Sequence, residues 1–196
     1  MGRVVIIDNG HGNNTPGKRS PDGKLLEYAW ARQMASLIVR YLCESGIDAR
    51  LLTPEENDIP IHVRVNRVNA ICRKLGPENV TLLSVHVNAA GNGKEWKNAR
   101  GFLSLVAPNA GDGSKRLARI IYDEAYKAGL EGNRSVARER YIVKDLAICR
   151  DTQCAAVLTE NLFMDNHDDC EYLLSKQGME TIARLHVDSV MKYLQR

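Results

Sequence analysis

The chain has 196 residues, of which 44% are hydrophobic and 26% charged, and its net charge is +3 at pH 7. This composition is typical of a globular protein and excludes wholesale disorder, and the length predicts a single domain over residues 1–196. The small net charge, with no run of Lys or Arg longer than two, argues against nucleic acid as a partner.

The first half of the chain alternates between predicted strands and helices. An apolar run at Val4–Asp8 predicts a buried strand, and Leu25–Cys43 repeats apolar side chains near a period of 3.6 residues, which predicts a helix. Ala49–Leu52 is expected to be the second strand. A second helix is expected to begin at Pro60 and to be closed by Gly76-Pro77.

The second half continues the same alternation. Strands are predicted at Val80–Val87, Phe102–Val106, Leu146–Cys149 and Ala155–Thr159, and helices at Asp112–Ala128 and Met179–Leu194. Strands that alternate with helices of this length predict an α/β fold in which helices flank a mostly parallel sheet. Since ligands of such sheets bind at the carboxyl ends of the strands, the polar groups at those ends are the candidate functional residues.

Four such groups are placed to converge. His11 follows the first strand, between two glycines that we expect to allow a tight turn, and His86 lies near the end of the third strand. Glu160 ends the strand that begins at Ala155, and Glu27 lies in the first turns of the first long helix. Two histidines and one carboxylate with an open fourth position form a hydrolytic zinc site, and a further carboxylate serves as general base.

Each group also has a simpler explanation. A histidine or glutamate at a strand end is often an ordinary surface residue, and an acid in the first turn of a helix, such as Glu27, is stabilised by the helix dipole. The other histidines are expected to be structural: His186 in the core, His62 on the surface, and His167, the best competing ligand, at a solvated helix start within an acidic run. Gly12–Lys18 matches a phosphate-binding loop but lacks the Ser or Thr and the helix that must follow it.

The cysteines and the start of the chain bear on localisation. Five cysteines without C-x-x-C spacing predict buried free thiols in a protein made in a reducing compartment, not a zinc ribbon or a secreted disulfide framework. Met1–Asp8 lacks the apolar region of a signal peptide, and no apolar stretch approaches the ~18 residues of a membrane span. We therefore expect synthesis in the cytoplasm and no membrane span.

Several segments together resemble one family. Val5–Gly12, continued by a Pro-Gly pair and the segment that ends at Glu27, resembles the opening of zinc-dependent N-acetylmuramoyl-L-alanine amidases of bacteria and phages, the Amidase_3 type. Ser84–Ala89 is similar to their second histidine motif, and Ala99–Phe102 to the segment that resumes the sheet. Leu146–Arg150 and Ala156–Glu160 are similar to the closing block. The matches keep the family's order from residue 4 to about 175.

The resemblance implies a mixed six-stranded sheet flanked by helices, a zinc ion bound by His11, Glu27 and His86, and Glu160 as the catalytic acid/base. The implied reaction is hydrolysis, by zinc-activated water, of the amide between N-acetylmuramic acid and L-alanine in peptidoglycan. The implied place of action is the cell wall, extracellular or periplasmic, reached after release as a phage lysin or as the mature part of an exported enzyme.

Some features of the sequence allow more than one interpretation. Asn88 shares a strand face with His86 and is expected either to contact substrate or to cap a loop. Cys154-Ala155 replaces the family's usual proline, and Leu162 replaces a glycine. Two alternative functions are a metallo-amidase or peptidase on another amide, and a non-catalytic wall-binding domain on the same fold.

Overall fold

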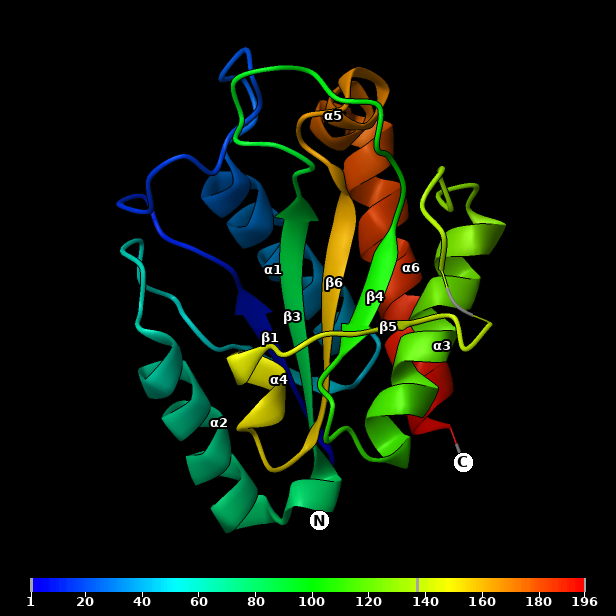
Figure 1. Ribbon diagram of the computed structural model, residues 1–196. Coiled ribbons are helices and arrows are strands. Elements are labelled where there is room, and N and C mark those ends of the chain that lie inside the picture. The colour runs from blue at the N-terminus through cyan, green and yellow to red at the C-terminus, as the bar shows by residue number, and fades with distance from the viewer. Residues whose placement is uncertain (1, 137, 196) are drawn as a thin grey trace.

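A six-stranded sheet forms the centre of the structure, a computed structural model that describes residues 2–136 and 138–195 (Figure 1). Its strands are β1 (Val4–Asn9), β2 (Asp48–Leu51), β3 (Val80–Asn88), β4 (Leu103–Val106), β5 (Ile142–Val143) and β6 (Ala155–Phe163). They lie in the order β2-β1-β3-β6-β4-β5. The strands β1, β2, β3 and β6 are parallel, whereas β4 runs antiparallel to β6 and β5 is parallel to β4. The predicted α/β class with a mixed, mostly parallel sheet is confirmed.

Helices cover both faces of this sheet (Figure 1). They are α1 (Glu27–Glu44), α2 (Ile61–Leu75), α3 (Asp112–Lys127), α4 (Ala147–Arg150), α5 (His167–Leu174) and α6 (Lys176–Leu194), with a 3-10 turn η1 at Pro77–Asn79. The helices α1, α3 and α6 pack on one face, and α2 and α4 on the other. None of the helices in the described ranges is long and apolar enough to cross a membrane.

Two hydrophobic cores result, one on each face of the sheet. Successive residues of β1 alternate between them: Val5 and Ile7 contribute to the core under α1, and Val4 and Ile6 to the core under α2. Because the central strands are buried on both faces, Val4–Ile7 of β1 is a continuous apolar run, and even the polar residues Thr81 and Ser84 of β3 are buried. This is why the sequence predicted these strands clearly.

One predicted strand is wrong. Leu146–Cys149 does not join the sheet; this segment forms the short helix α4, in which the backbone N–H groups of Cys149 and Arg150 both donate to the carbonyl of Leu146. Ile148 and Cys149 are neighbours in sequence and both buried, which a strand with one covered face would not allow. An apolar run of four residues fits either conformation, so periodicity could not decide. The remaining strand of the sheet is β5, which the sequence analysis missed.

The closing strand contains a bulge at Leu162. The register between β3 and β6 shifts after the pair His86–Glu160, and Leu162 adopts a φ of 65° although it is not glycine. A left-handed backbone costs such a residue roughly 1–2 kcal/mol. Its side chain is only 2% exposed and packs in the core under α1, and this burial offsets the cost. The chain thus keeps, with leucine, a conformation that favours glycine.

The remaining histidines and the cysteines lie largely where the sequence predicted. His186 is fully buried: its Nδ1 bonds the carbonyl of Ile182, and Thr159 lies 3.1 Å from its Nε2. His62 is exposed, and His167 is the exposed first residue of α5. All five cysteines are free thiols, but only Cys72, Cys149 and Cys170 are buried. The acidic run at His167 is less solvated than expected, because Asp165 and Asp169 are buried.

A buried ion pair joins β1 to α2 directly below the carboxyl end of the sheet. The Arg64 guanidinium lies 3.1 Å from both carboxylate oxygens of Asp8, and the Ser84 hydroxyl donates to Asp8 at 2.6 Å. The Asp8 side chain is 0% exposed and that of Arg64 is 8% exposed. Removing one partner of such a pair leaves an uncompensated charge inside the protein.

We expect Arg64→Met to lower the free energy of unfolding by about 3–5 kcal/mol, because the Asp8 carboxylate stays buried without its cation. The control is Arg50→Met, which removes the exposed ion pair of Arg50 with Asp48 and should cost less than about 1 kcal/mol. Urea denaturation of both variants measures the difference. Equal losses would contradict this account of the buried pair.

Candidate metal centre

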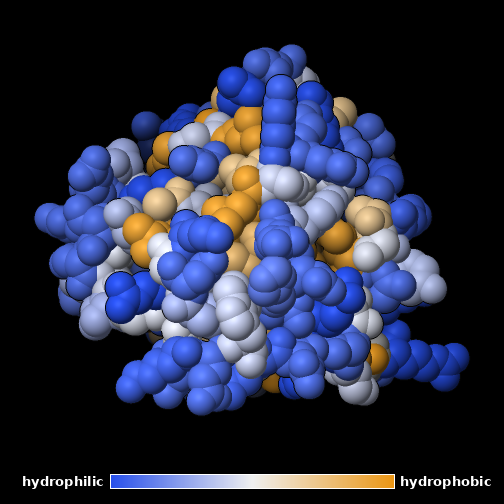
Figure 2. Space-filling view, turned by 90° about the horizontal axis from the view of Figure 1, so that it is seen from above, coloured by the Kyte–Doolittle hydropathy of each residue, from blue (hydrophilic) through white to orange (hydrophobic). Residues whose placement is uncertain are grey.

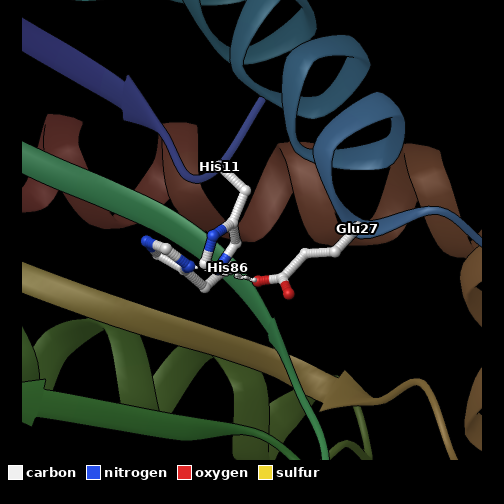
Figure 3. A group of neighbouring side chains, drawn as sticks. All are labelled: His11, Glu27 and His86. Atoms are coloured by element: carbon white, nitrogen blue, oxygen red, sulfur yellow. Dashed lines mark hydrogen bonds and ion pairs between the residues drawn. The ribbon is translucent and has the colours of Figure 1, made fainter. Parts of the chain in front are cut away.

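Three potential metal ligands from three elements meet at the carboxyl end of the sheet (Figure 3). His11 lies in the loop after β1, His86 is on β3, and Glu27 is the first residue of α1. Seen from above, this end of the molecule is mostly hydrophilic, with small hydrophobic patches near its centre (Figure 2). These three of the four polar groups predicted from the sequence therefore share one site. The fourth, Glu160, is the register partner of His86 on the neighbouring strand β6.

The three side chains are close enough to share one ion. The ligand atoms all lie within 4.8 Å of one another. Glu27 Oε1 is 3.1 Å from His86 Nδ1 and 3.5 Å from His11 Nε2. The two imidazole rings are nearly perpendicular, at 89°, with centroids 5.1 Å apart. Two imidazole nitrogens and one carboxylate oxygen make a donor set that suits zinc.

The Glu27 carboxylate is buried and only half satisfied. The residue is 1% exposed; Oε1 also accepts a bond from the Val87 N–H at 3.1 Å, whereas Oε2 has no partner among the described residues. Burial raises the pKa of Glu27, but the hydrogen bond and positive charge of His86 outweigh it, so the pKa is lowered overall. A buried, ionised carboxylate with a free oxygen is a group that a cation would complete.

The two histidines differ in their electrostatic surroundings. Burial lowers the pKa of both rings. For His86 the hydrogen bond and charge of Glu27 outweigh burial, and its pKa is raised overall. For His11 burial dominates, and its pKa is lowered. Metal ions bind the neutral imidazole ring. The lowered pKa of His11 favours that neutral, metal-binding form.

The loop that carries His11 is shaped by close contacts. The sequence suggested that the flanking glycines make the turn, but the left-handed residue is His11 itself, with a φ of 60°. The glycines are needed for space: a Cβ at Gly10 would overlap the His86 ring, and one at Gly12 would overlap the backbone of Asp58. The loop that carries His11 can therefore lie against β3 and residues 53–58 only because Gly10 and Gly12 have no side chains.

Arg32 fixes this loop to α1. Its guanidinium donates to the His11 carbonyl at 2.8 Å and, on the other side, to the carbonyls of Glu55 and Glu56 at 2.8 and 3.1 Å. A further bond of 3.3 Å joins it to the carbonyl of Tyr28 on its own helix. Arg32 thus holds His11, in its left-handed conformation, against α1, the helix that also supplies Glu27. Sequence reasoning missed it because all of these partners are backbone atoms.

Glu160 lies beside His86 on the neighbouring strand. The two residues are register partners in a parallel pair, so their side chains leave the same face of the sheet. Burial raises the pKa of Glu160 to about 7, and its Oε2 is out of contact with solvent and has no hydrogen-bond partner among the described residues. A carboxylate with a pKa near neutrality can both accept and release a proton.

The surroundings of Glu160 contain Asn88 and a pocket. Asn88 Oδ1 accepts the N–H of Ala89 at 2.9 Å, a local bond that caps the end of β3, and the residue also lines a pocket of about 350 Å³ shared with Glu160. A larger hollow, of about 600 Å³, lies at the opposite end of the sheet, near Arg3 and Tyr193. None of the four candidate residues borders it.

Asp165 organises the loop after β3, and sequence reasoning missed this role. Its carboxylate accepts the N–H groups of Ala90 at 2.9 Å and Gly91 at 2.7 Å, and its carbonyl accepts that of Lys97. Asn166 donates to the Lys97 carbonyl at 3.0 Å. The segment that leaves the candidate site is thus attached to the segment that follows β6.

Comparison with known proteins agrees with this picture. A family model described as N-acetylmuramoyl-L-alanine amidase (Amidase_3) matches residues 5–192. The endolysin of Bacillus phage SPP1 is 25% identical over 198 residues, which cover 99% of this chain and 67% of that protein. N-acetylmuramoyl-L-alanine amidase CwlM of Bacillus licheniformis is 28% identical over 188 residues, 96% of this chain and 67% of that protein. The chain thus spans about two thirds of the length of these relatives.

Solved structures show the same fold. The N-acetylmuramoyl-L-alanine amidase from Clostridium difficile 630 superposes with a TM-score of 0.83 at 24% identity, covering 98% of this chain and 97% of that one. Ami1 from Mycobacterium abscessus gives a TM-score of 0.83 at 21% identity, covering 99% of each chain. At these identities the likeness concerns the fold.

We expect Arg32→Met to loosen the loop around His11, since it removes the bonds to the His11, Glu55 and Glu56 carbonyls. The free energy of unfolding should fall by about 1–3 kcal/mol, and the amides of residues 10–13 should exchange hydrogen faster. Arg40→Met, on the same helix but in an exposed pair with Glu44, is the control. Unchanged exchange in the Arg32 variant would show that the loop does not depend on it.

Proposed function

This chain belongs to the N-acetylmuramoyl-L-alanine amidase family, and from that premise we propose that it hydrolyses the amide between N-acetylmuramic acid and L-alanine in peptidoglycan with a zinc ion bound by His11, Glu27 and His86. The observation that carries the zinc assignment is the partly satisfied Glu27 carboxylate, which lies buried between two imidazoles. The donor atoms and their spacing fit a zinc ion.

A zinc ion in this site supplies Lewis acidity, which polarises the amide carbonyl and acidifies water. Glu27 and the two histidines would hold the ion in place. Glu27 Oε1 contacts both rings and is itself held by a hydrogen bond from the Val87 N–H. His11 is aimed by its left-handed backbone and by Arg32. The chain's own contribution here is to hold three donors in one place before substrate arrives.

Glu160 moves the proton. It is not needed as a ligand, because three protein donors are enough for a hydrolytic zinc site. In our proposal its carboxylate accepts a proton from the attacking water and delivers it to the departing nitrogen of L-alanine. Its location beside His86 and its pKa of about 7 support this role.

The proposed zinc site predicts that His11→Ala and His86→Ala each lose both zinc and activity. Wild-type protein should contain one zinc per chain by atomic emission and should release new alanine amino termini from purified peptidoglycan. His62→Ala, which removes an exposed histidine at the start of α2, should keep both. A His11 or His86 variant with one equivalent of zinc and wild-type turnover would refute the assignment.

Removal of the metal should separate activity from folding. None of the three proposed ligands is part of either hydrophobic core, so a chelator should abolish turnover while circular dichroism still reports a folded chain. Unfolding on chelation would mean that the ion is structural, contrary to the proposal.

Glu160→Gln tests the proton transfer. The amide keeps the size of the side chain but cannot accept the proton, so the rate should fall by about 10²–10⁴-fold while zinc remains bound. Glu27→Gln is the matched variant and should instead lose zinc. If Glu160→Gln lost the metal and Glu27→Gln kept it, the two roles would have to be exchanged. A near-normal rate for Glu160→Gln would remove Glu160 from the mechanism.

A further inference from the structure

A pocket of about 350 Å³ adjoins Glu160. It begins at the end of β3, where Asn88 lines it, and extends past Glu160 toward β4 and β5, the strands that follow β6 in the sheet and lie farthest from His11. Leu103 of β4 and Ile142 of β5 form part of its wall, and none of the three ligands does. In Figure 1 the segment that contains β5 crosses in front of the sheet.

Two basic side chains, Arg134 and Lys144, line the pocket. Both residues are exposed, and within the described ranges neither is joined to a carboxylate by an ion pair. Two other arginines in this part of the chain do form ion pairs: Arg140 with Asp123, and Arg150 with Asp145 and Asp151. Among the described residues, Glu160 is the only carboxylate that borders the pocket. The pocket thus offers two uncompensated positive charges near the proposed proton-transfer residue.

The position of Glu160 decides which part of the substrate enters the pocket. The proposed reaction requires Glu160 to give a proton to the nitrogen of L-alanine, so this nitrogen must lie against Glu160. The stem peptide is attached to that nitrogen, whereas the glycan is attached to the carbonyl side of the bond. A pocket beyond Glu160 therefore faces the peptide.

We propose that this pocket is a subsite for a carboxylate of the stem peptide, held by Arg134 and Lys144. The proposal rests on the proposed function. The nearest candidate group is the carboxylate of the residue after L-alanine, a D-glutamate joined through its side chain, which leaves its α-carboxyl free; in some walls it is an amide. Arg and Lys recognise a carboxylate by charge-assisted hydrogen bonds, which an uncharged amide cannot replace. The subsite therefore favours walls with the free carboxylate.

A competing role for Lys144 is to act on Glu160 alone, since its charge favours the ionised form of that carboxylate. The two roles differ in what they predict. A cation that serves Glu160 affects every substrate alike, whereas a cation that binds the substrate carboxylate affects only substrates that have it.

The experiment compares two substrates that differ in one group: N-acetylmuramoyl-L-alanyl-D-glutamate and N-acetylmuramoyl-L-alanyl-D-isoglutamine, both with the γ-carboxyl capped as a methylamide so that only the first has a free carboxylate in its peptide. The double variant Arg134→Met/Lys144→Met should lose about tenfold in kcat/KM on the free carboxylate, mostly through KM, and less than about twofold on the amide. The control is Arg73→Met/Lys74→Met, which removes two exposed charges at the end of α2, outside the pocket. It should leave both substrates unchanged.

Equal losses on both substrates would assign the cations to Glu160, and no loss on either would remove them from recognition; both results overturn the proposal. A binding measurement separates its failure from that of the proposed function. Titration of L-alanyl-D-glutamate and of L-alanyl-D-isoglutamine, both capped as the γ-methylamide and followed by NMR, needs no turnover. Wild-type protein should prefer the carboxylate and the double variant should not, even if the protein hydrolyses neither substrate. Absence of that preference in wild-type protein overturns the subsite.

Discussion

The buried carboxylate of Glu27 is the group on which the arrangement of the site depends. One of its oxygens contacts both imidazoles and the Val87 N–H, so a single atom connects α1, the loop after β1 and β3. A charge that is 1% exposed is costly unless it is compensated. The two rings and the Val87 N–H surround one oxygen, whereas the other has no hydrogen-bond partner in the part of the chain that the structure describes. The site is therefore built around the Glu27 carboxylate, and its remaining negative charge favours the binding of a cation.

The loops around this anion are held mainly by charged side chains that bind backbone atoms. Arg32 attaches the His11 loop to α1 and to the 53–58 segment, and Asp165 attaches the loop after β3 to the end of β6. Below them the pair of Asp8 and Arg64 joins β1 to α2. Each contact links segments far apart in the sequence, and together they give irregular loops a fixed geometry without a regular hydrogen-bond ladder.

The sheet places the proposed chemistry by its register. His86 and Glu160 are partners across β3 and β6, and Leu103 of β4 is the partner of Glu160 on the other side. Because β4 runs antiparallel to β6, its beginning lies at the edge where the parallel strands end. That edge thus carries the proposed ligands at one end and the basic pocket at the other, with Glu160 between them.

The sequence by itself determined the α/β class, most of the helices and strands, and the convergence of His11, Glu27, His86 and Glu160, because buried parallel strands are continuous apolar runs whose carboxyl ends share one edge. It misassigned Leu146–Cys149, because an apolar run of four residues fits a helix as well as a strand. Only the tertiary structure decided the left-handed backbone of His11, the Arg32 and Asp165 contacts and the presence of Arg134 and Lys144 in one pocket with Glu160. These features bring together residues, backbone atoms and charges that are distant along the chain, and local sequence patterns do not report such proximity.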